Sequence, residues 1–166
     1  TDPTVPINPY GQSKLDFERL LDAYTEKITS IRFRYFNVAG AWPDGSLGES
    51  HNPETHIIPR FIQTLLADAD ELTIFGDDYP TADGTCIRDY IHVVDLAQAH
   101  CLGLEALGDG EAGGVYNLGN GEGFSNKQVA EACCRAIGAT PHIVFGDRRP
   151  GDPARLIASP QAAIER

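Results

Sequence analysis

Apolar residues recur along this chain with two alternating periods, one typical of helices and the other typical of strands. The first helical period begins directly after Asn8 and Pro9, which are favourable residues for the N-cap and the first helical position. Phe17, Leu21 and Tyr24 then fall within one sector of about 100° at about 3.6 residues per turn. We therefore predict an amphipathic helix that begins at residue 9.

Strand-like runs and helix-like stretches alternate through the rest of the chain. The predicted strands are 29–38, 72–75, 86–93, 115–118 and 142–145. The predicted helices are 57–69, 95–107, one that begins at Ser125 with Gln128 at capping-box spacing, and a last one from residue 159. The predicted loops, rich in glycine, proline and acidic residues, are 37–48, 77–84 and 148–153. Strands separated by helices predict an α/β protein with a largely parallel sheet.

Composition narrows the classes of partner. The chain has 166 residues, 42% of them hydrophobic and 22% charged, which is ordinary for a globular protein of single-domain size. Its formal net charge of −11 argues against general binding to nucleic acid or to an anionic membrane. A small anionic ligand remains compatible with this charge, because a few placed arginines can override the global field.

The four cysteines, Cys86, Cys101, Cys133 and Cys134, show no C-x-x-C spacing. Two of them are adjacent, so they suit neither a disulfide framework nor a zinc site. The apolar runs are too short to span a bilayer, and no signal peptide opens the sequence. We therefore expect a reduced, cytoplasmic protein.

Tyr10 and Lys14 lie one helical turn apart, so the phenol and the ammonium are expected on the same face. A lysine within an apolar stripe is costly unless its charge has a partner. A cation beside a phenol lowers the pKa of the tyrosine, which produces a usable base near neutral pH. In the alternative interpretation, Tyr10 packs while Lys14 extends to solvent.

Three further polar residues are candidates for ligand binding. Arg88 and Arg149 could each give two parallel hydrogen bonds to phosphate, although Arg88 could instead pair with Asp89 and Arg149 could simply be solvated. Asn37 follows a predicted strand, where parallel sheets place ligands, but asparagine is also a common turn residue.

Other glycine-rich, histidine and acidic patterns in the chain do not indicate a binding site. The glycines of 119–123 do not have the spacing of the dinucleotide fingerprint. The histidines have no ligand spacing and no partner cysteines typical of zinc, and the acidic loop 77–84 lacks the alternation of a calcium loop. We therefore predict no metal.

Five blocks of sequence resemble the UDP-glucose 4-epimerase family, a branch of the extended short-chain dehydrogenase/reductases. They are 8–14, 34–37, 75–95, 116–119 and 148–152. The resemblance runs in order over nearly the whole chain. It implies a partial Rossmann-type parallel sheet plus a smaller α/β substrate-binding domain.

The resemblance also implies a reaction. In this family the Tyr-x-x-x-Lys pair is catalytic, so Tyr10 would take the proton of the sugar 4-hydroxyl while hydride moves to bound NAD. Lys14 would hold the nicotinamide ribose, and Tyr35 and Phe36 would lie near the nicotinamide. UDP-glucose and UDP-galactose would then interconvert through a 4-keto sugar.

The substrate-binding residues implied by the resemblance are Asn37, His56, Ile57, Thr73, Phe75, Arg88, Arg149, Asp152 and Leu156. The two arginines would bind the diphosphate, Asp152 the uridine ribose, and Thr73 and Phe75 the uracil. His56 and Ile57 replace an Asn-Leu pair of some members.

Leu156 falls where the family sets the size of the sugar pocket. A tyrosine there goes with plain hexoses and small residues go with N-acetylated ones. Leucine lies between, which leaves UDP-N-acetylglucosamine open as a second substrate.

The family's glycine-rich NAD fingerprint and upstream catalytic Ser/Thr are not identified in this chain. We therefore expect the carboxy-terminal half of such an enzyme, with 1–50 as the last part of the NAD-binding domain and 51–166 mostly as the UDP-sugar-binding domain. We expect the chain alone to be inactive, and the full-length protein to be a homodimer. The alternatives are a dehydratase or decarboxylase of the same family, or a non-catalytic fragment that binds sugar nucleotides.

Overall fold

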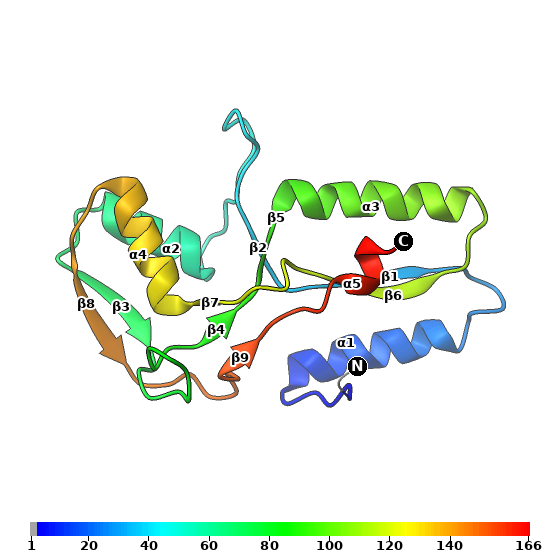
Figure 1. Cartoon of the computed structure of the whole chain (residues 1–166), viewed down its shortest axis with the longest axis horizontal. Coiled ribbons are helices and arrows are strands. Elements are labelled where there is room, and N and C mark those ends of the chain that lie inside the picture. The colour runs from blue at the N-terminus through cyan, green and yellow to red at the C-terminus, as the bar shows by residue number, and fades with distance from the viewer. Residues whose placement is uncertain (1–2) are drawn as a thin grey trace.

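A computed structural model describes residues 3–166, so the first two residues of the predicted 1–50 range lie outside it. Helices and short strands alternate along the chain (Figure 1). In chain order they are α1 (Pro9–Asp22), β1 (Ile31–Tyr35), β2 (Asn37–Ala39), α2 (Ile57–Leu66), β3 (Glu71–Phe75), β4 (Ile87–Arg88), β5 (Tyr90–His92), α3 (Val93–Gly108), β6 (Gly114–Leu118), β7 (Phe124–Ser125), α4 (Asn126–Ile137), β8 (His142–Gly146), β9 (Arg155–Leu156) and α5 (Gln161–Ile164).

The strands pair mainly in parallel. β1 pairs with β6, β2 with β5, and β3 with β8, each in parallel. β4 is central to a small sheet, antiparallel to β7 and parallel to β9. This arrangement confirms the predicted α/β class with parallel strands. Because β1 pairs with β6, strand pairing joins the range 1–50 to a much later segment, and the division at residue 50 stays a prediction.

Two helices begin where the capping residues predict. The Asn8 side-chain oxygen accepts a hydrogen bond from the Gly11 N–H at 2.8 Å, at the start of α1. At the start of α4, the Ser125 hydroxyl accepts from the Gln128 N–H at 3.1 Å, and the Gln128 side chain accepts from the Ser125 N–H at 2.8 Å. Both capping predictions are confirmed.

The buried core lies where α2 and α4 cover β3 (Figure 1, at the left). On β3, buried Leu72 and Ile74 alternate with exposed Glu71 and Thr73, as the period of two in a strand requires. The residues that complete this cluster are Phe61 and Leu65 of α2, Tyr90 of β5, and Val129, Ala130 and Cys133 of α4.

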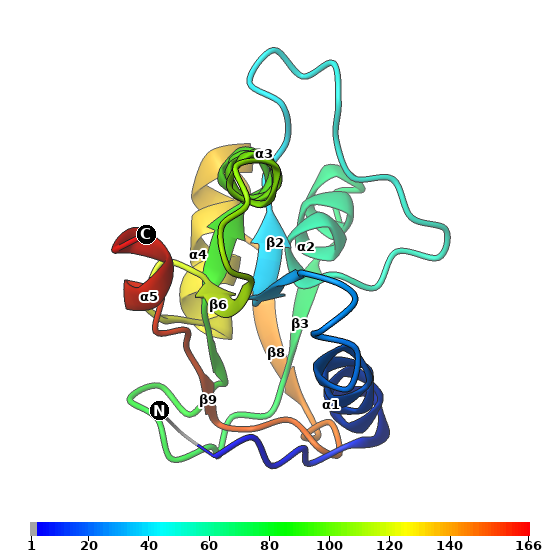
Figure 2. The same ribbon diagram turned by 90° about the vertical axis from the view of Figure 1, so that its right-hand side faces the viewer.

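The other part of the molecule is more open. α1 and α3 lie on opposite sides of the β1–β6 pair, as both views show (Figures 1 and 2). α3 approaches β1 closely at Gly103, where an added Cβ would lie 2.9 Å from the Phe33 ring. This close packing explains a glycine inside a helix, where it would otherwise cost about 1 kcal/mol relative to alanine.

Two differences from the predicted elements have clear causes. The run 29–38 forms two strands because the chain changes partner at Phe36, from β6 to β5. The predicted loop 37–48 therefore begins only after Ala39. β7 and β9 were not predicted, because each has only two residues and exists through its pairing with β4.

Candidate functional site

A hollow of about 130 Å³ lies beside the core, between α2 and β3. Five residues predicted to bind substrate line it: Ile57, Thr73, Phe75, Arg149 and Asp152. They come from the start of α2, from β3 and from the loop after β8. The fold thus gathers side chains that are far apart in the sequence around one space.

Arg149 lies against the aromatic wall of this hollow. Its guanidinium carbon is 4.4 Å from the centroid of the Phe75 ring, which is cation–π geometry. Arg149 is exposed, so its charge can meet an anion from solvent while its position is held by the ring. An aromatic face beside a guanidinium suits a planar base linked to phosphate.

Arg88 is held in place by two backbone carbonyls and by one carboxylate. One of its terminal nitrogens donates to the carbonyls of Ile87 at 2.9 Å and Pro153 at 2.8 Å, and the other lies 3.5 Å from Asp152. Its side chain is only 12% exposed. The ion pair of Arg88 is therefore with Asp152, and the alternative of a pair with Asp89 does not describe this structure.

Asp89 instead forms a buried junction of backbone donors. It has no exposed surface, and its carboxylate accepts from the N–H groups of Asn120 at 2.9 Å, Gly121 at 3.0 Å and Ala158 at 3.0 Å. An added Cβ on Gly119 would lie 2.6 Å from this carboxylate. A larger residue at position 119 would therefore clash with Asp89.

The backbone of Asp89 connects two of the predicted substrate-binding residues. Its carbonyl accepts from the side-chain amide of Asn37 at 3.0 Å, and its N–H donates to the Leu156 carbonyl at 3.0 Å. Asp89 was not among the predicted site residues. The signal in the sequence was the glycine-rich turn 119–123, whose free N–H groups need an acceptor.

Tyr10 and Lys14 share one face of α1, as their spacing predicted. The Lys14 ammonium lies 5.1 Å from the centroid of the Tyr10 ring. Tyr10 is 72% exposed, so the alternative in which it packs into the protein does not hold. The described lining of the hollow includes no residue of α1, so this pair and the hollow are separate places.

Burial distinguishes the tyrosines chemically. Tyr90 lies in the core, where burial raises its pKa to about 12. Burial also keeps its hydroxyl away from any ligand in solvent. Tyr79 is buried as well, whereas Tyr10 and Tyr35 are open to a ligand.

Tyr35 and Phe36 lie at the carboxyl end of β1. Tyr35 is 51% exposed, and its ring is 6.3 Å from that of His100 on α3. The Phe36 N–H donates to the Leu118 carbonyl at 3.4 Å. The carboxyl ends of parallel strands are where open α/β sheets bind ligands.

Four predicted substrate residues lie outside the described lining of the hollow: Asn37 and Arg88, described above, and Leu156 and His56. Leu156 is 45% exposed on β9, opposite Arg88 in register. His56 directly precedes α2 without capping it, and its ring turns toward Glu49 and Glu54. Ile57 is thus the member of the His56–Ile57 pair that reaches the hollow.

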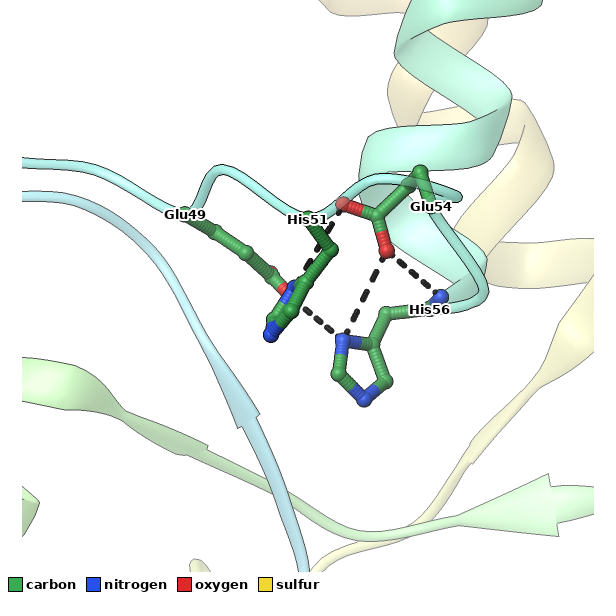
Figure 3. Close-up of side chains that lie close together, drawn as sticks. All are labelled: Glu49, His51, Glu54 and His56. Carbon is green, nitrogen blue, oxygen red and sulfur yellow. Dashed lines mark hydrogen bonds and ion pairs between the residues drawn. The ribbon is translucent and has the colours of Figure 1, made fainter.

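His56 belongs to a cluster with Glu49, His51 and Glu54 (Figure 3). One nitrogen or oxygen atom from each of the four side chains lies within 4.8 Å of the others. The prediction of no metal rested on histidine spacing and on partner cysteines. In the structure, the irregular loop before α2 brings two glutamates against two histidines, which residue spacing does not indicate.

The letters G-x-G-x-x-G do occur at residues 108–113. They follow α3 and precede β6, whereas the dinucleotide fingerprint follows a strand and opens a helix. The 108–113 segment therefore does not form the pyrophosphate-binding turn of a dinucleotide fingerprint. In the same part of the chain, no helix is long and apolar enough to cross a membrane.

Known proteins resemble this chain in sequence and in structure. The NAD dependent epimerase/dehydratase family matches residues 1–119. The UDP-glucose 4-epimerase of Lacticaseibacillus casei is 50% identical over 167 residues, which cover 98% of this chain and 50% of that protein. The enzyme of Halalkalibacterium halodurans is 49% identical, with 98% and 49% covered.

Solved structures of UDP-glucose 4-epimerases are also similar to this chain. UDP-glucose 4-epimerase from Brucella ovis in complex with NAD has a TM-score of 0.89 and 45% identity, over 97% of this chain and 50% of that one. The Bifidobacterium longum enzyme in complex with NAD+ and UDP has a TM-score of 0.88 and 37% identity, over 99% and 50%. The molecule thus has their Rossmann-like α/β fold and spans about half their length. That this is the carboxy-terminal half stays a prediction from its motifs.

Proposed function

Because the chain belongs to the NAD dependent epimerase/dehydratase family, we propose that it is part of a UDP-glucose 4-epimerase, which interconverts UDP-glucose and UDP-galactose. The observation that carries this proposal is the hollow, around which five predicted substrate residues meet. The alternatives, a dehydratase, a decarboxylase or a binding fragment, are separated from it by the product assay below.

The substrate side follows from the chemistry of the lining. The hollow is smaller than the roughly 300–1,000 Å³ of complete small-molecule sites, so we assign it the uridine diphosphate end of the substrate and not the sugar. Phe75 offers a ring face to the base, and Arg149 beside it offers charge to the diphosphate. Asp152 offers acceptors for ribose hydroxyls, and Arg88, already held beside it, adds a second cation.

The catalytic side rests on Tyr10 and Lys14. Tyr10 takes the proton of the sugar 4-hydroxyl and returns it at the end of the reaction, so one phenol serves as base and then as acid. Lys14 keeps a positive charge beside the phenol during this exchange. When bound, NAD supplies the acceptor and donor of hydride for the sugar carbon.

The residues present fit the nicotinamide end of NAD. Tyr10 and Lys14 are exposed on one helix face, and Tyr35 is exposed at the carboxyl end of a parallel strand with Phe36 next to it. The pyrophosphate end needs a G-x-G-x-x-G turn that follows a strand and opens a helix, and residues 3–166 do not contain one. We propose that the other half of the protein supplies it.

The test is conversion of UDP-galactose to UDP-glucose by the full-length protein, numbered as here. Tyr10→Phe should lower kcat by about 10²–10⁴-fold, the usual contribution of a general acid–base group. UDP affinity, measured by calorimetry, should be unchanged. Tyr24→Phe, on an exposed position of the same helical region, is the matched control. Full turnover by Tyr10→Phe, or a product other than the 4-epimer, would reject the proposal.

The same assay with UDP-N-acetylglucosamine examines the second substrate. Leu156 is partly exposed and smaller than tyrosine, which leaves space for an acetamido group. Turnover of both sugars is the expected result.

A further inference from the structure

The loop before α2 folds four side chains inward upon one another: Glu49, His51, Glu54 and His56 (Figure 3). The Nδ1 atom of His51 lies 2.9 Å from Glu49 and 3.7 Å from Glu54. The Nδ1 atom of His56 lies 3.6 Å from Glu54 and also contacts Glu49. Both imidazoles therefore present the same kind of nitrogen to the same two carboxylates.

Local backbone geometry holds one ligand in place. One Glu54 oxygen accepts from the N–H groups of Thr55 at 2.7 Å and His56 at 2.8 Å. The side chain of Glu54 is 5% exposed, and its other oxygen faces His51. A buried carboxylate that is fixed in this way presents an oxygen without further ordering.

The other three side chains of the cluster are accessible to solvent. The side chains of Glu49, His51 and His56 are 25%, 53% and 60% exposed. The loop that carries them (40–56) extends away from the rest of the molecule (Figure 2). An ion can thus reach the cluster without a change in the core.

The ligand set identifies the class of ion. Two imidazole nitrogens with two carboxylate oxygens suit zinc and related transition metals, whereas calcium and magnesium prefer all-oxygen sites. Two carboxylates also balance the charge of a divalent ion. We propose that Glu49, His51, Glu54 and His56 bind one divalent ion of the zinc class.

Such an ion would fix the start of α2. His56 directly precedes this helix, and the next residue, Ile57, lines the hollow. The ion would also direct the His56 ring away from the role in substrate binding that the resemblance implies. The metal proposal itself does not depend on the proposed function.

The competing explanation is a purely ionic cluster, in which protonated imidazoles pair with the glutamates and no metal binds. The two are separated by titrating chelator-treated full-length protein with Zn²⁺ in a calorimeter. His51→Ala and Glu49→Gln should each weaken one equivalent of binding by more than about tenfold, since even residues that only orient a ligand cost that much. His142→Ala, an exposed histidine outside the cluster, should bind as the wild type does.

X-ray absorption at the zinc edge gives an independent test on the wild type. The expected first shell contains two imidazoles and oxygen ligands at about 2.0–2.2 Å, and no sulfur. Sulfur ligands would assign the zinc to the free cysteines and overturn the proposal. So would wild-type protein that binds no zinc, or a His51→Ala variant that binds it equally well.

Discussion

At the scale of single residues, Asp89 shows how one side chain can organise a site that it does not line. Its carboxylate collects three backbone N–H groups, while its own backbone joins Asn37 to Leu156. Hydrogen bonds to an ionised group are roughly twice as strong as neutral ones, so this junction is stiff. The predicted sugar pocket inherits its geometry from a buried acid.

Asp89→Asn should lower the free energy of unfolding by about 3 kcal/mol, because the amide NH₂ opposes a buried N–H donor that loses its acceptor. We expect weaker UDP binding as well, since the segment after β9 is held by the bond from the Ala158 N–H to this carboxylate. Urea unfolding and calorimetry of the full-length protein measure the two effects. Asp147→Asn, on the exposed loop after β8, should change neither. Equal stability of Asp89→Asn and the wild type would contradict the junction.

At the scale of elements, α1 is attached to the sheet by charge more than by apolar packing. Arg34 of β1 forms a fork with Glu18, whose carboxylate it contacts through two nitrogens, one at 2.7 Å. Arg32 donates to the Glu18 carbonyl at 3.2 Å and to Asp22 at 2.6 Å. Phe17 of α1 is 59% exposed, and the helix has no buried residue.

This attachment should depend on pH. The hydrogen bond from Arg34 holds the pKa of Glu18 below its ordinary value of 4.5. A carboxyl whose pKa is lower in the folded state than in the unfolded state stabilises the folded protein at pH values above the unfolded-state pKa. This stabilisation is lost as the pH falls through the folded-state pKa. Glu18→Gln should therefore reduce stability by about 1 kcal/mol at pH 7 and by much less below the lowered pKa.

Urea unfolding of the full-length protein at several pH values measures this difference. Glu26→Gln, an exposed glutamate beyond the end of α1, is the control and should show no such dependence. A constant difference between Glu18→Gln and the wild type at all pH values would show that the fork is not the cause.

The sequence predicted these elements unevenly. The predicted helix starts were correct where the capping residue is adjacent in sequence, as at Asn8 and Ser125. The two-residue strands β7 and β9 could not be predicted, because only their partner defines them. The direction of the α1 face was also beyond local patterns, since it depends on the distant pair Glu18 and Arg34.

The same division holds for the site. Thr73, Phe75 and Arg149 were expected from the family resemblance, and the fold brings them to one hollow. The cluster around His51 was missed, because it depends on how an irregular loop folds back and not on any spacing.

At the scale of the whole molecule, the buried apolar residues gather in one part of the fold. The core lies under α2 and α4, while α3 leaves Leu102 57% and Leu104 70% exposed, and α1 leaves Leu20 53% exposed. Exposed leucines on these two helices are compatible with a contact that covers them. We expect the rest of the protein to cover the α3 side, and the partner subunit of a homodimer to cover α1.

The 166-residue chain produced by itself should bind no NAD at stoichiometric levels and should self-associate. The first follows from the lack of a pyrophosphate cradle in residues 3–166, and the second from the open apolar faces. Calorimetry with NAD and light scattering measure the two properties, with the full-length protein as the reference. One equivalent of tightly bound NAD in the isolated chain would contradict the first statement.

Strand pairing has a final consequence, for the time the chain takes to fold. Each parallel pair joins segments that are distant in the sequence, as Ile31 with Gly114 and Glu71 with His142 show. Contacts of this kind must close long loops before they gain any energy, so folding is slow compared with that of a helical bundle of similar size. During synthesis β1 leaves the ribosome long before β6 exists. Its edge then stays unpaired, which exposes the growing chain to aggregation until β6 is made.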